Sequence, residues 1–379
     1  MKTGLITFHH AHHYGAQLQA YALMKKIEGM GTDCEIINYV RPDTTEGNRL
    51  FKKGLSARAF LSNVNTLINY SQLKKRYVRF ESFVNDDMKL SRKFYDSYEE
   101  LLKDVPEYDA YVCGSDQIWN PLIFKENTYD PAFFADFAKG GRRIAYAPSF
   151  GITEIPEDKR EDLRRYLKHF DCLSVREKQG EKIIRDVTGR DSVTVLDPTL
   201  LLTGDEWGEL SAEPVFKEPY ILCYFISDPG GYSGYVKALS EKYRLPVVSL
   251  CGARRVVPQT RHIVLDAGPR EFLGLFRNAS MVCTNSFHGT VFSVTFKKDF
   301  FSFATALNTE KTVNSRLYNI LEKLGLAGRI FSSGMEAGDF LSRINDEASL
   351  IDYVSVYEML EKEREMSYKY LKDSLLFNR

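Results

Sequence analysis

The sequence predicts an α/β protein made of two halves, each built on a parallel sheet with helices packed against it. Two observations support this fold class. Near the N-terminus, an apolar run at 4–8, a helical pattern at 15–27 and a second apolar run at 34–40 follow one another. This order is typical of two parallel strands joined by a helix. The same order returns after the middle of the chain, where apolar runs at 220–226 and 246–250 flank a helical pattern.

Two Glu-Pro steps mark a linker at 213–219. We therefore expect an N-terminal domain over residues 1–212, a C-terminal domain over 213–350 and a long charged helix over 351–379. Residues 43–104 are rich in Lys, Arg, Asn and Ser, and their apolar side chains recur at helical spacing. This segment is predicted to be a helical insertion laid over the first sheet. Its apolar positions are Leu67, Tyr70, Leu73, Tyr77, Phe80 and Phe83.

The composition argues against several classes of protein. Lys plus Arg and Asp plus Glu each number 51 among 379 residues, so no net charge favours nucleic acid or a membrane surface. The basic residues at 74–76 and 79 are interpreted as a solvated helix face. The six cysteines form no CxxC pair, and no apolar run is long enough to span a membrane. The N-terminus lacks the pattern of a signal peptide, so we expect a cytoplasmic protein without nucleic-acid partners.

The loop after the first strand carries four of the seven histidines, at positions 9, 10, 12 and 13. Neighbouring histidines do not easily converge on one tetrahedral metal ion without a carboxylate or cysteine nearby, so we expect no metal site. Ligands bind at the carboxyl ends of parallel strands. His13 and Tyr14 are therefore predicted to contact a polar substrate.

The strand predicted at 108–113 runs into a Gly-Ser-Asp turn that ends at Asp116. The turn places a carboxylate at the carboxyl edge of the sheet, so Asp116 is a candidate general base. Gln117, Trp119 and Asn120 offer amides for hydroxyl groups and a ring for stacking on a sugar. An alternative fits the sequence equally well: Asp116 caps a helix and Trp119 packs in the core.

The strand predicted to start at Cys172 ends at Arg176. A guanidinium at this edge of the sheet is suited to hold a carboxylate or a phosphate with two hydrogen bonds. The alternative is a structural ion pair between Arg176 and either Glu177 or Asp197. Asp197 lies in the Asp-Pro turn that follows the next apolar run.

In the second half, the run Met281–Cys283 is predicted to be a buried strand that leads into a turn and a helix. Asn285 and Ser286 are good N-cap residues, and Gly289 lets the backbone approach a neighbour closely. His288 then lies at the helix N-terminus, where backbone N–H groups and the helix dipole favour an anion. It is a candidate general acid. The alternative is a hydrogen-bonded packing residue.

Five motifs together carry a family resemblance. They are Phe8-His-His-Ala-His-His-Tyr-Gly-Ala-Gln-Leu-Gln-Ala-Tyr-Ala-Leu23, Gly114-Ser-Asp-Gln-Ile-Trp-Asn120, Leu173-Ser-Val-Arg-Glu177, Val195-Leu-Asp-Pro-Thr199 and Thr284-Asn-Ser-Phe-His-Gly-Thr290. In order and approximate spacing they resemble the polysaccharide pyruvyl transferase family, in the branch with an HxxxxYGAxLQAYAL-type N-terminus. The resemblance implies a fold similar to GT-B glycosyltransferases, with two Rossmann-like domains facing a cleft. The acceptor would bind on the N-terminal side and the donor on the C-terminal side.

The resemblance also implies an activity. Members of the family move the pyruvyl group of phosphoenolpyruvate onto two sugar hydroxyls as a cyclic ketal, in the synthesis of cell-surface polysaccharides. By position, the catalytic histidine matches His288, the anion-binding arginine matches Arg176 and a lysine beyond the histidine matches Lys311. Asp116 would orient or deprotonate the sugar, and the amides near Asn285 and Ser286 would help Arg176 and Lys311 to bind the anions. The implied partners are phosphoenolpyruvate and a glycan or lipid-linked glycan, and no cofactor or metal is implied.

Two other functions remain as hypotheses. A GT-B-like fold also suits a glycosyltransferase that uses a nucleotide sugar, but we find no carboxylate convincingly placed in the second domain to bind a ribose. A non-catalytic glycan-binding relative is the third hypothesis. The joint presence of His288, Arg176 and Lys311 argues against it, because a non-catalytic relative with the same fold need not keep all three.

Overall fold

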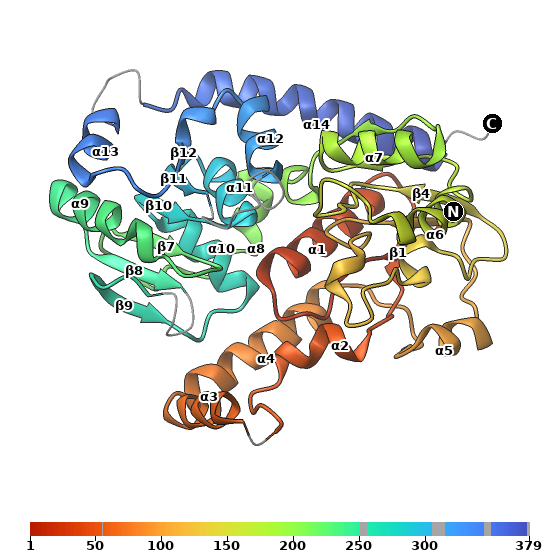
Figure 1. Cartoon of the computed structure of the whole chain (residues 1–379), viewed down its shortest axis with the longest axis horizontal. Coiled ribbons are helices and arrows are strands. Elements are labelled where there is room, and N and C mark those ends of the chain that lie inside the picture. The colour runs from red at the N-terminus through yellow and green to blue at the C-terminus, as the bar shows by residue number, and fades with distance from the viewer. Residues whose placement is uncertain (55, 251–255, 305–314, 345–349, 377–379) are drawn as a thin grey trace. The chain divides into compact units, whose positions relative to one another are not determined.

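The computed structural model describes residues 1–54, 56–250, 256–304, 315–344 and 350–376. The chain forms two compact units. The N-terminal unit comprises Met1–Asn65, Phe80–Leu202 and Lys362–Arg379, and the C-terminal unit comprises Thr66–Arg79 and Thr203–Glu361. Each contains a parallel sheet with helices around it (Figure 1). The predicted α/β fold class with two parallel sheets is therefore confirmed, and the predicted cleft stays a prediction.

In the described part of the N-terminal unit, parallel strands pair in the order β2-β1-β3-β4. Their bounds are β1 Lys2–Ile6, β2 Asp33–Ile36, β3 Ala110–Cys113 and β4 Arg142–Ala145. A parallel pair, β5 (Ser174–Val175) and β6 (Val193–Thr194), is joined to β4 by a bridge between Ile144 and Cys172. The chain extends the sheet first to one side of β1 and then, with β3, to the other. The space between the ends of β1 and β3 is therefore a topological switch point, where ligands bind in such sheets.

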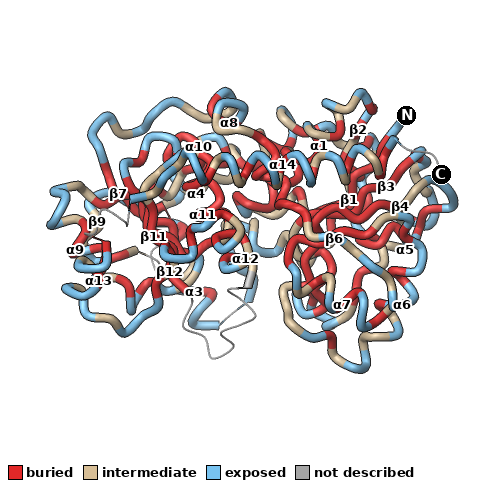
Figure 2. Tube along the Cα trace, turned by 90° about the horizontal axis from the view of Figure 1, so that it is seen from above, coloured by how far each residue is buried: buried red, intermediate tan, exposed pale blue. Residues whose placement is uncertain are grey.

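The helices of this unit cover the sheet and leave a largely aromatic core. Their bounds are α1 Tyr14–Glu28, α2 Pro42–Thr45, α5 Tyr98–Lys103, α6 Arg160–Leu167 and α7 Lys178–Thr188. The helix α1 joins β1 to β2, as the sequence predicts. Trp119, Phe133 and Phe134 are among the buried rings. Figure 2 shows the buried residues concentrated along the strands.

In the described part of the C-terminal unit, a parallel sheet has the order β12-β11-β10-β7-β8-β9. The strands are β7 Ile221–Tyr224, β8 Val247–Leu250, β9 Thr260–Val264, β10 Met281–Thr284, β11 Asp299–Phe303 and β12 Ile330–Phe331. The helices are α8 Gly204–Leu210, α9 Ser233–Tyr243, α10 Pro269–Asn278, α11 Phe287–Thr295, α12 Ser315–Lys323 and α13 Ala337–Ile344. This strand order is that of a Rossmann fold, with its switch point between β7 and β10.

The insertion consists of two main helices, α3 (Ala57–Ile68) and α4 (Tyr70–Asp87), which break at Asn69. Phe80 and Phe83 are buried and contact Tyr14 and Tyr21 of α1. The expectation that all six apolar positions pack on the sheet is wrong, because Leu67 and Tyr70 are exposed. Leu67 lies in α3, before the break, and Tyr70 lies in the first turn of α4, on a different side of that helix from Phe83.

The last helix, α14 (Tyr353–Leu376), confirms the predicted C-terminal helix. Its first part belongs to the C-terminal unit, where the Tyr357 hydroxyl donates to the Thr295 carbonyl at 2.6 Å. Its second part belongs to the N-terminal unit, where Arg364 Nε donates to the Leu200 carbonyl at 2.5 Å. Within the described ranges, no helix combines the length and the apolar composition needed to cross a bilayer.

Candidate functional site

In the C-terminal unit, the turn from β10 to α11 lies at the topological switch point. Three side-chain hydrogen bonds join it to the end of β7 and to the turn that follows. Thr284 Oγ1 donates to the Tyr224 carbonyl at 2.6 Å. Asn285 Oδ1 accepts from the Ile226 amide at 2.8 Å, and its Nδ2 donates to Ser227 Oγ at 2.7 Å. Asn285 therefore fixes the geometry of both loops at the point where a ligand binds in this fold.

The helix α11 begins immediately after this turn. Ser286 is its N-cap, and Ser286 Oγ accepts from the Gly289 amide at 3.3 Å. A Cβ atom at Gly289 would lie 2.3 Å from Thr284 Oγ1, so only glycine fits against the strand end. His288 occupies the first turn and is 4% exposed, and its ring lies nearly perpendicular to that of Phe287, with 5.2 Å between the ring centres. The helix N-terminus adds partial positive charge for an anion.

A cation also lies beside this turn. The Arg316 guanidinium, from the first turn of α12, is 5.9 Å from the centre of the Phe287 ring. The sequence patterns gave Arg316 no role, because the packing of α12 on α11 is not visible in a linear pattern. Lys311, the lysine predicted to bind the donor, lies outside the described residues.

In the N-terminal unit, polar side chains join the two sides of the switch point between β1 and β3. Gln19 on α1 donates from Nε2 to Thr7 Oγ1 at 2.9 Å and accepts at Oε1 from the Ser115 amide at 3.0 Å. Thr7 Oγ1 donates to the Ser115 carbonyl at 3.2 Å. Sequence reasoning missed Gln19 and Thr7 as site-forming residues. Both lie inside or beside the first motif, which was the available signal.

Asp116 follows this anchored turn in the left-handed region, with φ of 68°. Its Oδ1 accepts from the Gln117 amide at 2.9 Å, and its side chain is 13% exposed. Gln117 Oε1 in turn accepts from Asn120 Nδ2 at 2.9 Å. Gly151 lies against these two amides, since a Cβ there would be 2.0 Å from Gln117 Oε1. The structure thus places Asp116, Gln117 and Asn120 together at the carboxyl edge of the sheet.

Arg176 belongs to the same unit but is surrounded by carboxylates. Its Nη1 donates to Asp197 Oδ2 at 2.7 Å, its Nη2 lies 3.5 Å from Asp116 Oδ1 and its Nε lies 3.9 Å from Glu177 Oε2. Burial lowers the pKa of Arg176, but attraction to Asp197, Asp116 and Glu177 outweighs burial, so the pKa rises. The predicted anion-binding role of Arg176 is not supported, because its charge is already compensated. The predicted alternative, an ion pair with Asp197, is the arrangement found.

Trp119 is a second correction. Its side chain is 0% exposed, and its ring stacks on Phe134 at a centroid distance of 5.3 Å. Its Nε1 donates to the Phe133 carbonyl at 3.2 Å. The prediction that Trp119 stacks on a sugar is therefore wrong, because both the ring and its polar atom are used inside the core. The alternative interpretation, a packing tryptophan, describes its position.

The histidines of the first loop serve mainly to hold the loop itself. His13 is the N-cap of α1 and accepts from the Ala16 amide at 3.2 Å. His12 Nε2 lies 2.7 Å from Glu81 Oε1. Burial, with a smaller contribution from His10, lowers the pKa of His9 to about 4.

Tyr14 is buried against Phe80, so its predicted substrate contact is not supported. Among the described residues, no three His, Cys, Asp or Glu side chains are grouped to hold a metal ion.

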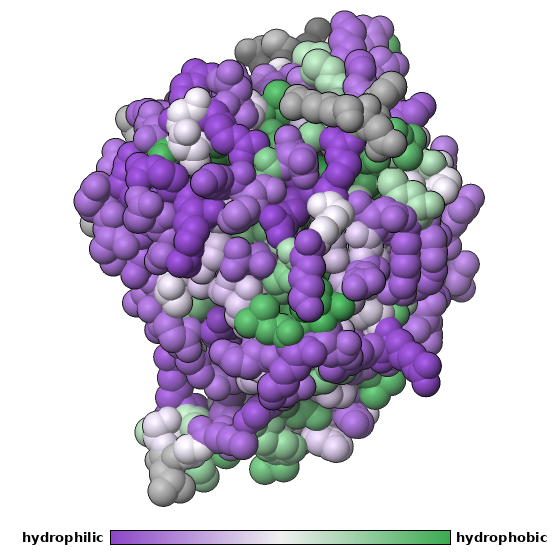
Figure 3. Space-filling model, turned by 90° about the vertical axis from the view of Figure 1, so that its right-hand side faces the viewer, coloured by the Kyte–Doolittle hydropathy of each residue, from purple (hydrophilic) through white to green (hydrophobic). Residues whose placement is uncertain are grey.

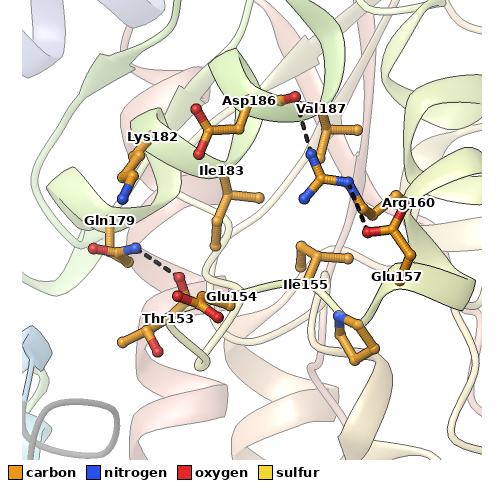
Figure 4. Close-up of a pocket in the computed structure, with 11 residues that line it drawn as sticks. Thr153, Glu154, Ile155, Glu157, Arg160, Gln179, Lys182, Ile183, Asp186 and Val187 are labelled. Atoms are coloured by element: carbon orange, nitrogen blue, oxygen red, sulfur yellow. Dashed lines mark hydrogen bonds and ion pairs between the residues drawn. The ribbon is translucent and has the colours of Figure 1, made fainter.

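A cavity of about 590 Å³ lies between α6, α7 and the segment 153–157 of the N-terminal unit. Figure 4 shows the side chains around it, including Gln179, whose Nε2 donates to the Thr153 carbonyl at 2.6 Å. Arg160 donates to the Asp186 carbonyl at 3.1 Å on the opposite side. The segment begins two residues after Gly151, which contacts Gln117. Asp116, Gln117 and Asn120 are not among the residues that line the cavity.

Comparisons with known proteins place these features in a family. A family model described as polysaccharide pyruvyl transferase matches residues 13–306. No curated protein matches the sequence. Solved structures with a similar arrangement include UDP-GlcNAc 2-epimerase from Methanocaldococcus jannaschii, with 12% identity, a TM-score of 0.49, and coverage of 97% of this chain and 100% of that one. UDP-GlcNAc 2-epimerase from Neisseria meningitidis has 9% identity and a TM-score of 0.49, and the match covers 100% of both chains. E. coli heptosyltransferase WaaC has 9% identity and a TM-score of 0.39, and the match covers 85% of this chain and 99% of that one. These values are too low to decide function.

Proposed function

Because the chain belongs to the polysaccharide pyruvyl transferase family, we propose that it transfers the pyruvyl group of phosphoenolpyruvate to two hydroxyls of a glycan or glycan precursor. The product is a cyclic ketal, and inorganic phosphate is released. The observation that carries the proposal is the position of His288. It lies in the first turn of α11, at the switch point of the C-terminal sheet, where an anionic donor has backbone N–H groups and a guanidinium nearby.

The reaction needs a proton donor, anion-binding groups and a base. The methylene carbon of phosphoenolpyruvate takes a proton and becomes a methyl group, while one sugar hydroxyl adds to the adjacent carbon. The bond from that carbon to the phosphate oxygen then breaks, and the second hydroxyl closes the ketal. Of the two protons that the hydroxyl groups lose, one accounts for the proton gained by the methyl group and the other leaves with phosphate.

His288 is proposed as the general acid for the methylene carbon. The N-terminus of α11 and Arg316 are proposed to bind the carboxylate and phosphate of the donor, with Lys311 as a further cation from the sequence resemblance. Asp116 is proposed as the base for the acceptor hydroxyl, with Gln117 and Asn120 as hydroxyl-binding amides. Arg176 is not among the donor-binding groups, for the reason given above.

Ligand-induced stabilisation tests the donor. A ligand that binds only the folded protein raises its melting temperature by mass action. We expect a saturable rise in melting temperature with phosphoenolpyruvate and a smaller rise in Arg316→Gln. The control variant is His169→Ala, which changes an exposed histidine in the other unit. A rise with nucleotide sugars alone would favour the glycosyltransferase hypothesis. Release of phosphate in the presence of candidate glycans then tests the transfer itself, and binding without turnover on any acceptor would favour a glycan-binding relative.

A further inference from the structure

The helix α3 exposes its large apolar side chains instead of burying them. Phe60, Leu61, Leu67 and Ile68 are 68%, 61%, 64% and 76% exposed, and Val64 is also exposed. At 3.6 residues per turn these five positions fall within roughly 120° of arc. We call them the α3 stripe. Contiguous apolar surface of this kind marks an interaction site more often than isolated exposed side chains do.

The packing of α3 is the reverse of an ordinary surface helix. Its buried positions are the small residues Ala59 and Thr66, which are 7% and 4% exposed. A surface helix normally turns its large apolar residues toward the core. The face that α3 presents to solvent is therefore the one with the larger hydrophobic driving force. Figure 3 shows one face of the molecule, on which hydrophilic side chains predominate and apolar side chains form smaller patches near the centre and along the lower edge.

The sequence around α3 is strongly basic. Residues 49–80 contain eight Lys and Arg and no Asp or Glu, although the whole chain has no net charge. The backbone of Lys52 is held against α3, since its amide donates to Asn63 Oδ1 at 2.7 Å and its carbonyl accepts from Asn63 Nδ2 at 3.1 Å. Lys75 and Arg79 pair with Asp266. The exposed side chains of Lys52, Lys53 and Lys74 contribute positive charge on the segments that flank the stripe.

We propose that the α3 stripe and its flanking basic residues form a docking surface for an anionic lipid bilayer. An apolar helical face bordered by Lys and Arg is the pattern of helices that lie in the membrane interface. A second copy of the chain fits less well. A two-fold contact through this surface would bring the same basic segments of both copies together, and like charges oppose such a contact. The proposal goes beyond the proposed transferase activity, because docking requires neither donor nor acceptor.

Sedimentation of the full-length protein with vesicles tests the proposal. We expect binding to vesicles of phosphatidylcholine mixed with phosphatidylglycerol, weaker binding to phosphatidylcholine alone, and a decrease as salt screens the charges. The double variant Phe60→Ser/Ile68→Ser should weaken binding by about a hundred-fold, from the loss of two inserted apolar side chains. The matched control Leu350→Ser/Val354→Ser changes two side chains of similar exposure, 76% and 71%, elsewhere on the chain.

A charge variant tests the second half of the pattern. Lys52→Gln/Lys53→Gln should weaken binding to the anionic vesicles by about thirty-fold, if each basic residue near the membrane surface contributes as it does in other proteins. The control Lys139→Gln/Lys168→Gln removes two exposed lysines from another region. Far-ultraviolet circular dichroism of each variant shows whether it is folded.

Three results would overturn the proposal. One is the absence of sedimentation with the anionic vesicles, and another is equal loss of binding in the stripe variant and its control. The third is a dimer, seen by light scattering, that the stripe variant converts to a monomer without any vesicle binding by the original chain. That result would assign the stripe to a contact between copies. None of these outcomes affects the proposed donor, which the melting-temperature experiment tests separately.

Discussion

Replacing Gly289 by alanine tests the geometry of the α11 turn. The new Cβ would lie 2.3 Å from Thr284 Oγ1 and 3.1 Å from a ring carbon of Tyr224. Neither neighbour moves freely, because Thr284 ends a central strand and its hydroxyl makes two hydrogen bonds. It donates to the Tyr224 carbonyl at 2.6 Å and accepts from the Ser286 amide at 3.0 Å. The substitution therefore forces apart the contacts that place His288.

The expected cost follows from these contacts. Overpacking a close-packed site costs about 1–3 kcal/mol, and two weakened hydrogen bonds add about 1 kcal/mol each. Because the substitution weakens these bonds without removing them, we expect a loss of about 3 kcal/mol in the free energy of unfolding. For a unit of this size that is a fall of roughly 6–12 °C in melting temperature.

The matched control is Gly234→Ala in α9, where a Cβ meets nothing within 4 Å. Alanine there should leave stability unchanged or raise it by up to about 1 kcal/mol. Urea unfolding of the two variants beside the original chain measures both effects. If Gly289→Ala is as stable as Gly234→Ala, the close approach of α11 to Thr284 is refuted, and the position of His288 with it.

Three further predictions follow. His288→Gln should lower turnover by about 10²–10⁴-fold, as expected for a lost general acid, while phosphoenolpyruvate still raises the melting temperature; unchanged turnover would make His288 a packing residue. Arg176→Met should destabilise the chain by about 3–5 kcal/mol in urea unfolding, because it leaves buried carboxylates such as Asp197 unpaired; a stable variant that fails only to bind phosphoenolpyruvate would instead restore the anion-binding role. The pKa of His9 is lowered to about 4 in the folded chain, whereas a histidine in the unfolded chain has a pKa of about 6.5. The folded chain therefore keeps its full stability above about pH 6.5. As the pH falls toward 4, the unfolded chain binds a proton that folded His9 does not, and the free energy of unfolding drops by about 3 kcal/mol. The difference in unfolding free energy between the original chain and His9→Gln, measured across that range, should show this loss, and a constant difference would contradict it.

The sequence predicted the elements of the fold better than their neighbours in space. Strand, helix, strand order and the turn before α11 follow from local apolar runs and N-cap residues, so Ser286 and Gly289 could be placed in advance. The partners of Arg176 and Trp119 could not. Arg176 lies at the end of a strand, where an ion pair and a ligand contact give the same sequence pattern. Only the fold of the chain around Asp197 decides between them. The same is true of Trp119, because the sequence near a turn does not show that Phe134 packs on this ring.

Local sequence patterns do not show the order of strands in each sheet. That order decides which motifs lie next to each other in the fold. Both switch points are joined by a side-chain amide that bonds across two loops, Gln19 in the N-terminal unit and Asn285 in the C-terminal unit. Such an amide is recognisable only once β1 is known to lie beside β3, and β7 beside β10. Because these amides fix the loops that carry Asp116 and His288, a substitution at either one should reduce activity without touching the reacting groups. The motifs therefore mark residues that build the site as well as residues that act in it.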